Sequence, residues 1–426
     1  MRTAPQRKQS PPAAAPVVSA TPVPAHHTNR HLAAALFAAA SGDRITVVTA
    51  PPGAGKTFLI SHLADQLSQR IGLRVAVAAQ TREQAYDVAN RIAALGAPTR
   101  FLIGKNDPRP RALATEVAAI KAGRAPLNAT GGVAVATSAR WLHTPSRTYR
   151  ADILLVDEAY QMTYADLIAI GNLADQYVLV GDPGQIAPVV TGETRRWAHT
   201  ATGPHLPAPQ ALNGAHPEAI TRVNLDTTHR LGPSTAALVA PLYPTLPFSS
   251  ARPPSHVTHN GDRLPEYRAL DHPVRHDHTD PAVAAAAATT ARDLLNSTIT
   301  TTEGTRSTRP ADIAVIAPHV DQAALIAAHL ADQPDILVGT INQAQGIERH
   351  IVVAVHPLTG HPDCPTFATD LGRLCVTLSR HRSHLSIITD TNTPHYLAEA
   401  TQEATRAHQE VLTIQSQILT TLHTGK

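Results

Sequence analysis

A glycine-rich segment at residues 50–57, with the sequence APPGAGKT, contains the residue types that bind the phosphate groups of a nucleotide. It follows an apolar run at 45–49 that predicts a buried strand, and it precedes a predicted helix at 58–69. In such a loop the backbone N–H groups surround the phosphates, a lysine reaches the β- and γ-phosphates, and a hydroxyl binds Mg²⁺. The segment therefore predicts a site for ATP and Mg²⁺. The alternative is a Pro-Gly turn with a Lys-Thr pair by chance.

Individual residues of this loop have separate predicted roles. Lys56 is expected to be catalytic as well as phosphate-binding, and Thr57 is expected to hold Mg²⁺ through its hydroxyl. Ala50 stands where such loops usually have their first glycine. The predicted nucleotide-binding residues of this segment are Pro52, Gly53, Ala54, Gly55, Lys56, Thr57 and Phe58.

A second apolar run, at 153–156, ends in the carboxylates Asp157 and Glu158. Phosphoryl transfer needs charge neutralisation and an oriented nucleophile. We therefore expect Asp157 to hold Mg²⁺ and Glu158 to activate the attacking water. An Asp-Glu pair alone more often marks the N-terminus of a helix, but its position after a buried strand and downstream of the glycine-rich loop favours the catalytic interpretation.

The segments that must position these groups alternate between short apolar strands and helices. Such alternation predicts parallel sheets covered on both faces, so the fold class is α/β. Further helices are predicted at 31–40 and 83–95. Further strands are predicted at 75–79, 133–136, 177–180, 313–317, 351–355 and 385–388.

A chain of 426 residues with 43% hydrophobic residues is long enough for two domains. The predicted division is a disordered basic tail rich in Pro and Ala at 1–28, a first domain at 29–205, a second at 206–393 and a C-terminal helix at 394–426. Residues 191–220 have the composition of a linker. The polar segment 251–281 gives no prediction.

Charge and composition restrict the classes of partner. The net charge is +3, of which the basic residues Arg2, Arg7, Lys8 and Arg30 contribute +4, so the remainder of the chain carries about −1. Any nucleic acid must therefore be held in a local groove rather than by the overall field. The chain has no apolar run of the roughly 18 residues that a membrane helix needs. We expect a cytoplasmic protein without a membrane partner.

Several segments resemble the motifs of superfamily 1 helicases, in the branch of the nonsense-mediated-decay RNA helicase and its bacterial DNA relatives. The sequence DEAYQ at 157–161 resembles that branch's Asp-Glu-Ala-x-Gln box, and VGDPGQIAP at 180–188 resembles its third motif. The resemblance implies two tandem RecA-like P-loop NTPase domains with minimal insertions. It also implies that Gln185 senses the γ-phosphate of ATP.

The second half of the chain carries the rest of the resemblance. LDTTHR at 225–230 resembles the fourth motif, in which a Tyr-Arg pair stacks on adenine and reaches the γ-phosphate; here His229 replaces the tyrosine. The sequence at 338–348 resembles the fifth motif, which implies that Gly346 and Glu348 contact the nucleotide. The implied nucleic-acid contacts are Thr81, Arg82, Thr137, Ser138 and Thr340.

The sequence RLCVTLSR at 373–380 resembles the sixth motif. The resemblance implies that Arg230 and Arg380 are catalytic arginines that the second domain supplies to ATP held by the first. Hydrolysis would then require closure of the cleft between the domains. The alternative for Arg380 is a surface arginine at the end of a strand.

Other polar residues receive structural interpretations. Asn29 lies near the place of the family's adenine-reading glutamine, but it is interpreted as a helix cap. A zinc site is not favoured for His361, Cys364, Cys375 and His381, because Cys375 lies in an apolar segment expected to be a strand. The histidines His272, His276 and His278 are interpreted as solvated. The apolar positions of 404–418 are spaced as in a helix that docks on the body, or alternatively in a dimer seam.

The resulting functional hypothesis is an ATP-dependent helicase or translocase on single-stranded nucleic acid, with DNA favoured over RNA. The alternative is a regulatory or defence ATPase that signals to a protein partner, through the tail or the C-terminal helix, without unwinding. A binding module without catalysis is disfavoured, because the nucleotide-contacting positions other than the adenine-reading one retain workable chemistry. A monomer is expected.

Overall fold

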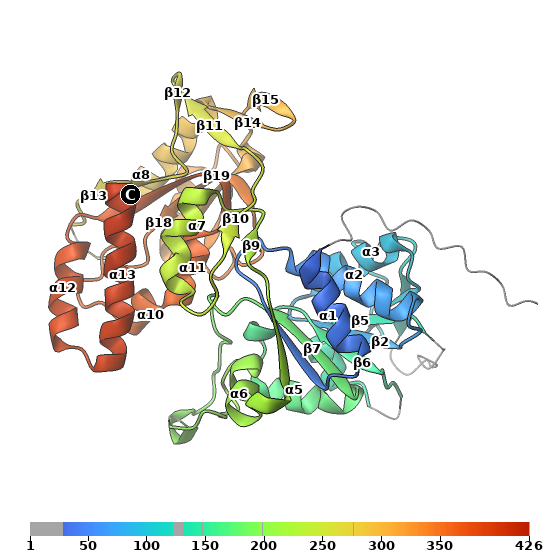
Figure 1. The fold of residues 1–426 in the computed structure, drawn as a ribbon. Coiled ribbons are helices and arrows are strands. Elements are labelled where there is room, and N and C mark those ends of the chain that lie inside the picture. Colours follow the sequence, from blue (N-terminus) through green and yellow to red (C-terminus); the bar gives the residue numbers. More distant parts are fainter. Residues whose placement is uncertain (1–28, 122–130, 146–147, 198, 276, 426) are drawn as a thin grey trace, which may run out of the picture.

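The computed structural model describes residues 29–121, 131–145, 148–197, 199–275 and 277–425. Two α/β domains follow one another along the chain (Figure 1). The predicted disordered tail lies outside the described residues.

Within the described residues, the first domain is built on a parallel sheet of eight strands in the order β4-β3-β5-β2-β6-β7-β1-β8. Its central strands are apolar on both sides because helices cover both faces of the sheet. The strands are β1 (Ile45–Thr49), β2 (Val75–Ala79), β3 (Thr99–Ile103), β4 (Ala118–Lys121), β5 (Val133–Thr137), β6 (Ile153–Val156), β7 (Gln176–Gly181) and β8 (Ile220–Asn224).

The first domain extends beyond its predicted end at residue 205. Strand β8 pairs in parallel with β1 over its whole length, from Ile45 opposite Ile220 to Thr49 opposite Asn224. Only Ile220 and Val223 of β8 are buried, on opposite faces of the sheet, and this pattern is too weak to distinguish an edge strand from a linker. The boundary between the domains therefore follows residue 224.

Helices cover the two faces of this sheet with separate cores. Helices α1, α2 and α3 pack on one face, and α4, α5 and α6 pack on the other. Their bounds are α1 (Arg30–Ala40), α2 (Lys56–Gln69), α3 (Arg82–Leu95), α4 (Ser138–Leu142), α5 (Tyr164–Ile170) and α6 (Ala208–Ala215). Asn29 caps α1 by accepting from the N–H groups of His31 and Leu32, so its interpretation as a helix cap is confirmed.

In the part of the chain that the structure covers, the second domain contains a parallel sheet of five strands in the order β13-β19-β18-β16-β17. These are β13 (Tyr267–His272), β16 (Ile313–Ala317), β17 (Leu337–Thr340), β18 (Arg349–Val355) and β19 (His381–Asp390). Strand β13 falls in the segment 251–281 that gave no prediction. The predicted α/β class with two parallel-sheet domains is confirmed.

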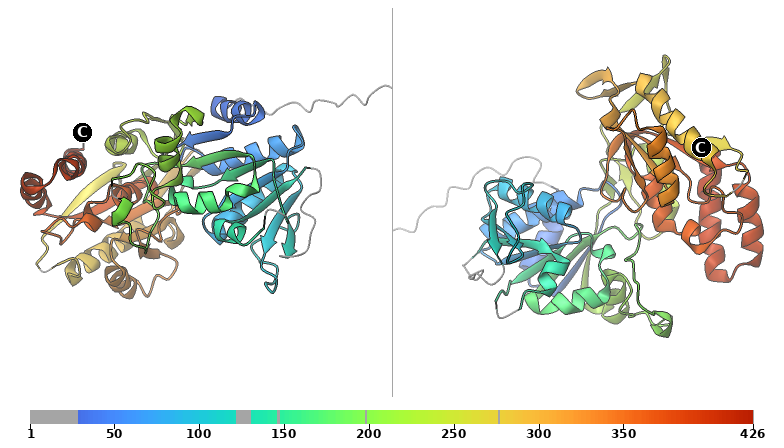
Figure 2. Two further views of the ribbon diagram at one scale, coloured as in Figure 1. Left: turned by 90° about the horizontal axis from the view of Figure 1, so that it is seen from below. Right: turned by 180° about the vertical axis from the view of Figure 1, so that it is seen from behind.

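The second domain also has helices on both faces (Figure 2). Helices α7 (Pro233–Val239), α11 (Leu371–Leu378) and α13 (Arg406–Thr424) pack on one face, and α8 (Pro281–Asp293) and α9 (Val320–His329) pack on the other. The segment around Cys375 is helix α11 rather than the expected strand. Residues 374–378 are all buried, and a run this short is compatible with a buried strand as well as with a helix.

Smaller elements connect these layers. Strands β9 (Thr227–Thr228) and β10 (Ser249–Ser250) form a short pair at the junction between the domains. An antiparallel sheet at one end of the second domain contains β11 (His256–His259), β12 (Asp262–Arg263), β14 (Thr298–Thr301) and β15 (Gly304–Ser307). No helix among the described residues is long and apolar enough to cross a membrane.

The single helix predicted at 394–426 is two helices, α12 (Thr393–Glu403) and α13. The chain leaves the helical conformation at Ala404, whose ψ is 153°, and Thr405 begins the next helix. Ile418 and Leu422 of α13 are buried in the core of the second domain, and helix α10 (Thr366–Thr369) lies against the same hairpin. The docking interpretation is thus confirmed for Ile414 and Ile418 of the predicted apolar stripe, whereas Ala407 is exposed.

Replacement of Ile418 by alanine is expected to lower the free energy of unfolding by about 2–5 kcal/mol, because its fully buried side chain would leave a cavity. The exposed Thr420→Ala on the same helix is the matched control and should change stability little. Chemical denaturation measures both. A loss of stability in Ile418→Ala that depended on protein concentration would indicate a dimer seam instead.

Candidate functional site

The glycine-rich loop lies between β1 and α2, at the carboxyl edge of the first sheet. Gly53 and Gly55 have φ angles of 74° and 86°, in the left-handed region that favours glycine. A Cβ atom on Gly53 would lie 2.3 Å from Cβ of Arg230, so this position also requires glycine for lack of space. Helix α2 begins at Lys56, whose side chain is 10% exposed.

Two carboxylates from neighbouring strands face Lys56. Its Nζ lies 3.5 Å from Oε1 of Glu158 and 3.9 Å from Oδ2 of Asp182. Strand β6 ends immediately before Asp157, which is buried, and burial together with the charge of Glu158 raises the pKa of Asp157. A carboxylate desolvated in this way is stabilised by a cation beside it. The oxygen donors Asp157 and Thr57 therefore suit Mg²⁺, which prefers oxygen ligands.

Glu158 has an unusual backbone conformation for a residue with a side chain. Its φ of 51° and ψ of 47° lie in the left-handed region, which costs on the order of 1–3 kcal/mol. Such strain persists where surrounding structure imposes it, and it is concentrated at functional sites. Glu158 thereby points toward Lys56 at the edge of the sheet rather than continuing strand β6.

Asp182 lies within the segment that resembles the third motif, and its contacts join several parts of the site. Its carboxylate accepts hydrogen bonds from the Gly184 N–H (2.9 Å) and from Nε2 of Gln185 (2.9 Å). It also accepts one from the hydroxyl of Tyr243, in the second domain (2.8 Å). The same carboxylate lies near Lys56 of the glycine-rich loop. Asp182 thus connects that loop, Gln185 and the second domain.

The chain also returns from the first domain directly onto the glycine-rich loop. The hydroxyl of Thr228 donates to the carbonyl of Pro52 (2.7 Å), and the N–H of His229 donates to the carbonyl of Gly53 (2.9 Å). These bonds place the next residue, Arg230, against the loop. Thr228 received no role from the sequence, although it lies within the segment that resembles the fourth motif.

Arg230 and Glu348 form an ion pair at the mouth of the site. Nε of Arg230 lies 2.7 Å from Oε2 of Glu348, and Arg382 contacts the other oxygen of the same carboxylate. Burial raises the pKa of Glu348, but the two guanidinium groups lower it further, so the net pKa is below its usual value. Glu348 therefore remains ionised and positions both arginines.

Arg380 is buried, with 1% of its surface exposed, and follows helix α11. The alternative of a surface arginine at the end of a strand is wrong. Nη2 of Arg380 donates to the hydroxyl of Ser379 (3.0 Å), whereas its Nε has no hydrogen-bond partner among the described residues. Burial and the nearby Arg230 lower its pKa. An anion in the adjoining cleft would satisfy this guanidinium.

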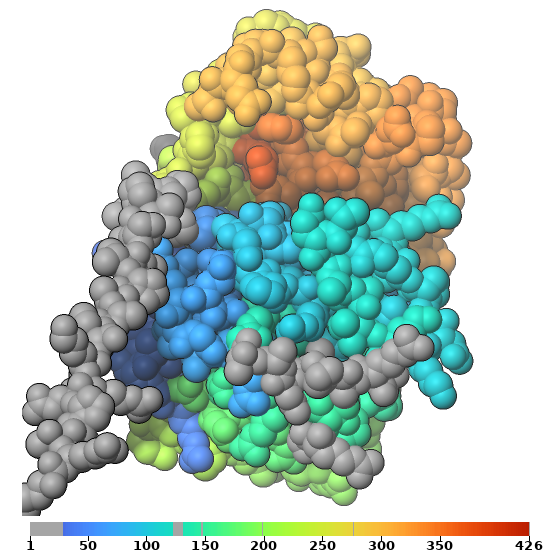
Figure 3. Space-filling model, turned by 90° about the vertical axis from the view of Figure 1, so that its right-hand side faces the viewer, coloured from blue at the N-terminus to red at the C-terminus, as the bar shows by residue number. Residues whose placement is uncertain are grey.

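These groups surround a cleft of about 840 Å³ between the two domains. Figure 3 shows the first domain, in blue to teal, meeting the second, in yellow to orange. The predicted site residues that line the cleft are Gly53, Ala54, Gly55, Lys56, Thr57, Phe58, Thr81, Asp157, Glu158, Gln185, His229, Arg230, Gly346, Glu348 and Arg380. Pro52 is engaged with Thr228 instead.

The predicted nucleic-acid contacts do not gather at one place. Arg82 and Thr137 line a separate pocket of about 270 Å³, together with Tyr86, Phe101 and Arg140. Thr81 lines the nucleotide cleft and caps α3. The remaining two are engaged within the protein: the hydroxyl of Ser138 donates to the carbonyl of Ala79 (3.3 Å), and that of Thr340 donates to Gln343 (3.2 Å).

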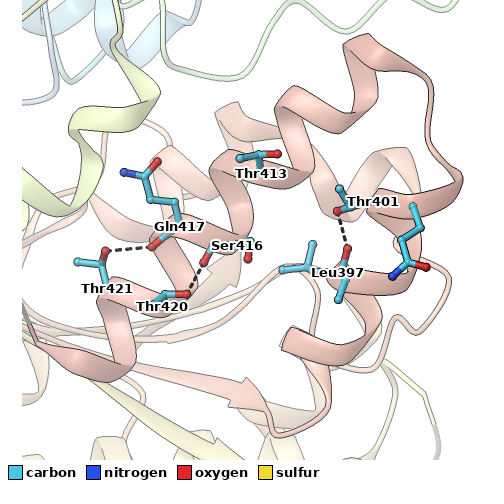
Figure 4. Close-up of a pocket in the computed structure, with 9 residues that line it drawn as sticks. Leu397, Thr401, Thr413, Ser416, Gln417, Thr420 and Thr421 are labelled. Atoms are coloured by element: carbon cyan, nitrogen blue, oxygen red, sulfur yellow. Dashed lines mark hydrogen bonds between the residues drawn. The ribbon is translucent and has the colours of Figure 1, made fainter.

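A further groove, of about 560 Å³, lies between α12 and α13 (Figure 4). The hydroxyls of Thr401, Thr420 and Thr421 bond to carbonyls of their own helices. No charged side chain of the described residues lines this groove. It therefore lacks the groups that bind phosphates, and the interdomain cleft is the candidate site.

Comparisons with solved structures find helicases at low identity. The chain is similar to the arterivirus nonstructural protein 10 helicase, with 17% identity and a TM-score of 0.44 over 84% of this chain and 61% of that chain. The same helicase in complex with DNA gives 17% identity and a TM-score of 0.43, over 83% and 62%. The Escherichia coli DEAH/RHA helicase HrpB gives 13% and 0.41, over 84% and 42%. This chain thus spans about three fifths or less of the length of these proteins.

Comparison with curated proteins gives no significant match. Family models, in contrast, match both domains: one AAA domain model covers residues 28–207, and a second AAA domain model covers residues 271–392. The two matched segments together span well over half of the chain. Both domains of the chain therefore match models of AAA domains.

Proposed function

We propose that this protein hydrolyses Mg-ATP in the cleft between its domains and uses the closure of that cleft to move on single-stranded nucleic acid, with DNA favoured over RNA. The observation that carries the proposal is the composition of the cleft. Lys56 and Glu158 come from the first domain, whereas Arg230 and Arg380 come from the second. A site divided in this way couples hydrolysis to domain movement.

The first domain would bind the nucleotide and prepare the attacking water. The N–H groups of the glycine-rich loop and Lys56 would hold the phosphates, and Thr57 and Asp157 would hold Mg²⁺. Mg²⁺ neutralises charge on the phosphate oxygens when it is bound. Glu158 would accept the proton of the attacking water, because its carboxylate lies at the mouth of the loop, 3.5 Å from Nζ of Lys56.

The second domain would complete the site. Arg380 has an unsatisfied Nε beside the cleft, so a developing negative charge on the γ-phosphate would give it the partner that it lacks. Arg230 is positioned by Glu348 and lies against Gly53. Gln185 would contact the γ-phosphate and also donates a hydrogen bond to Asp182. Because Tyr243 of the second domain donates to the same carboxylate, a change at the γ-phosphate would reach the second domain through these two bonds. Release of phosphate would loosen this set of contacts and allow the domains to separate.

A nucleic-acid strand would be held by the pocket that contains Arg82 and Arg140. Nε of Arg140 is buried without a hydrogen-bond partner among the residues described, which favours a phosphate as its missing partner. Tyr86 lines the same pocket and would offer a ring for a base, with the buried Phe101 behind it at 5.0 Å between ring centroids. Thr340 would contact the strand on the second domain only after releasing Gln343.

Replacement of Glu158 by glutamine should separate ATP binding from hydrolysis. The neutral amide retains the shape of the side chain but cannot take a proton, so turnover is expected to fall by about 10²–10⁴-fold. ATP affinity should be preserved or increased, because a negative charge near the phosphates is removed. Steady-state hydrolysis and equilibrium binding of a fluorescent ATP analogue measure the two effects. Normal turnover would show that Glu158 does not activate the water.

Single-stranded DNA is expected to increase ATP turnover, and to do so more than single-stranded RNA. Arg82→Ala should weaken the strand's effect and reduce the slope of log affinity against log salt by about 1, as expected for one lost phosphate contact. Arg150→Ala is the matched control, because Arg150 is an exposed arginine paired with Asp175 away from both sites. If neither DNA nor RNA changed turnover, a regulatory ATPase that signals to a protein partner would be the better account.

A further inference from the structure

Three histidines that are distant in the sequence meet at the carboxyl edge of the second domain's sheet. His278 precedes α8, His319 precedes α9, and His361 follows β18. One ring nitrogen of each lies within 4.8 Å of those of the other two, and Nε2 of His319 is 2.8 Å from Nε2 of His361. They meet because β16 and β18 are neighbouring parallel strands and because α8 packs against α9.

The surrounding backbone fixes the positions of these rings. A Cβ atom on Gly360 would lie 2.5 Å from the N atom of His278, so the two loops are in tight contact. The buried Gln322 donates to the carbonyl of His278 (3.1 Å). The rings of His278 and His361 are nearly parallel, at 8°, with centroids 4.9 Å apart. The cluster is therefore held by main-chain packing as well as by its own contacts.

Three converging imidazoles are a ligand set of Zn²⁺. Zinc binds each nitrogen at about 2.0–2.1 Å, and tetrahedral geometry then separates the ligand atoms by about 3.3 Å. The separations here extend from 2.8 Å to less than 4.8 Å and so bracket that value.

This cluster differs from both sets of residues considered in the sequence, which were the set that contains His361 and Cys375 and the polar loop that contains His278. Cys375 lies in the core beside Tyr243, and His381 is buried against Thr235, so both are separated from His361. Of the polar-loop histidines, His278 alone contributes, and His276 lies outside the described residues. The cluster depends on His319, which no sequence pattern singled out.

We propose that His278, His319 and His361 bind one Zn²⁺ ion, with water in the fourth position. Bound zinc would cross-link the loops that follow β16 and β18 to the loop that precedes α8. The zinc site would also be connected to the nucleotide cleft by a line of side-chain contacts that begins at His319. His319 stacks on Phe367 at 5.0 Å, and the guanidinium of Arg373 lies 4.0 Å from the centroid of the same ring.

Arg373 extends this line of contacts to the cleft. Its Nη1 donates to Oδ1 of Asn342 (3.0 Å), and Asn342 lines the cleft between the domains. Zinc would therefore restrict the motion of the edge of the second domain from which Asn342 lines the nucleotide cleft. The inference does not depend on the substrate proposed above, because it concerns a site in one domain.

The test measures zinc on the full chain without a polyhistidine tag. After treatment with a chelator, loading with Zn²⁺ and removal of free metal, wild type should retain about one ion per chain. His319→Gln and His361→Gln should each lose it. The exposed His395→Gln on α12 is the matched control and should retain zinc. Replacement by Co²⁺ should give the visible absorption of a four-coordinate site in wild type and in the control.

Thermal unfolding distinguishes loss of the site from loss of the fold. Added Zn²⁺ should raise the unfolding midpoint of wild type and His395→Gln, because a ligand stabilises the state that binds it. Both cluster variants should unfold cooperatively and bind ATP, with midpoints that zinc does not raise. Absence of stoichiometric zinc from wild type, or its retention in folded cluster variants, would overturn the proposal and leave only a hydrogen-bonded histidine cluster.

Discussion

The two hydrogen bonds from Thr228 and His229 to the carbonyls of Pro52 and Gly53 are the contacts on which the rest of the site depends. They attach the segment that leads into the second domain to the loop that would hold the phosphates. Movement of the glycine-rich loop therefore moves Arg230, and movement of Arg230 is transmitted to Glu348 and Arg382. Glycine at position 53 is required for this contact, because any side chain there would occupy the space of Arg230.

A second connection runs through the buried carboxylate of Asp182. Burial of a charge is costly unless hydrogen bonds and a counter-charge compensate for it, and Asp182 receives three hydrogen bonds and lies near Lys56. The phenol of Tyr243 is one of the donors, and burial raises its pKa well above the usual value. Separation of the domains would remove this donor from the Asp182 carboxylate, whose side chain is fully buried in the closed arrangement. The closed arrangement is therefore stabilised at the position where the γ-phosphate would be sensed.

Much of the first domain could be predicted from the sequence, because its central strands are continuous apolar runs and its glycine-rich loop has a fixed chemical pattern. Strand β8 was missed because it has only two buried apolar residues, one on each face of the sheet, and so resembles a linker in composition. Helix α11 was misassigned as a strand because it is only eight residues long and its consecutive residues 374–378 are all buried, as those of a central strand would be. The site residues in motifs could be predicted because each motif is a short contiguous segment whose residue types indicate its role.

Contacts between distant segments could not be predicted where the contacting residues lie outside a recognisable motif. The pair Asp182 and Tyr243 joins the third motif to a segment without polar periodicity, and the histidine cluster joins three loops that only the strand order brings together. The buried state of Arg380 also depends on packing of the second domain against the first. These tertiary contacts turn a nucleotide-binding loop into a site shared between two domains.

The central claim is that ATP held by the first domain is hydrolysed with the help of an arginine from the second. The most direct measurement compares ATP binding and ATP turnover in Arg380→Ala, with thermal unfolding as a check that the chain remains folded. The account predicts that ATP still binds while turnover falls by roughly 10³-fold or more, as for loss of other arginines that stabilise the transition state of phosphoryl transfer. Turnover equal to that of wild type would contradict it, because the first domain would then be sufficient for hydrolysis.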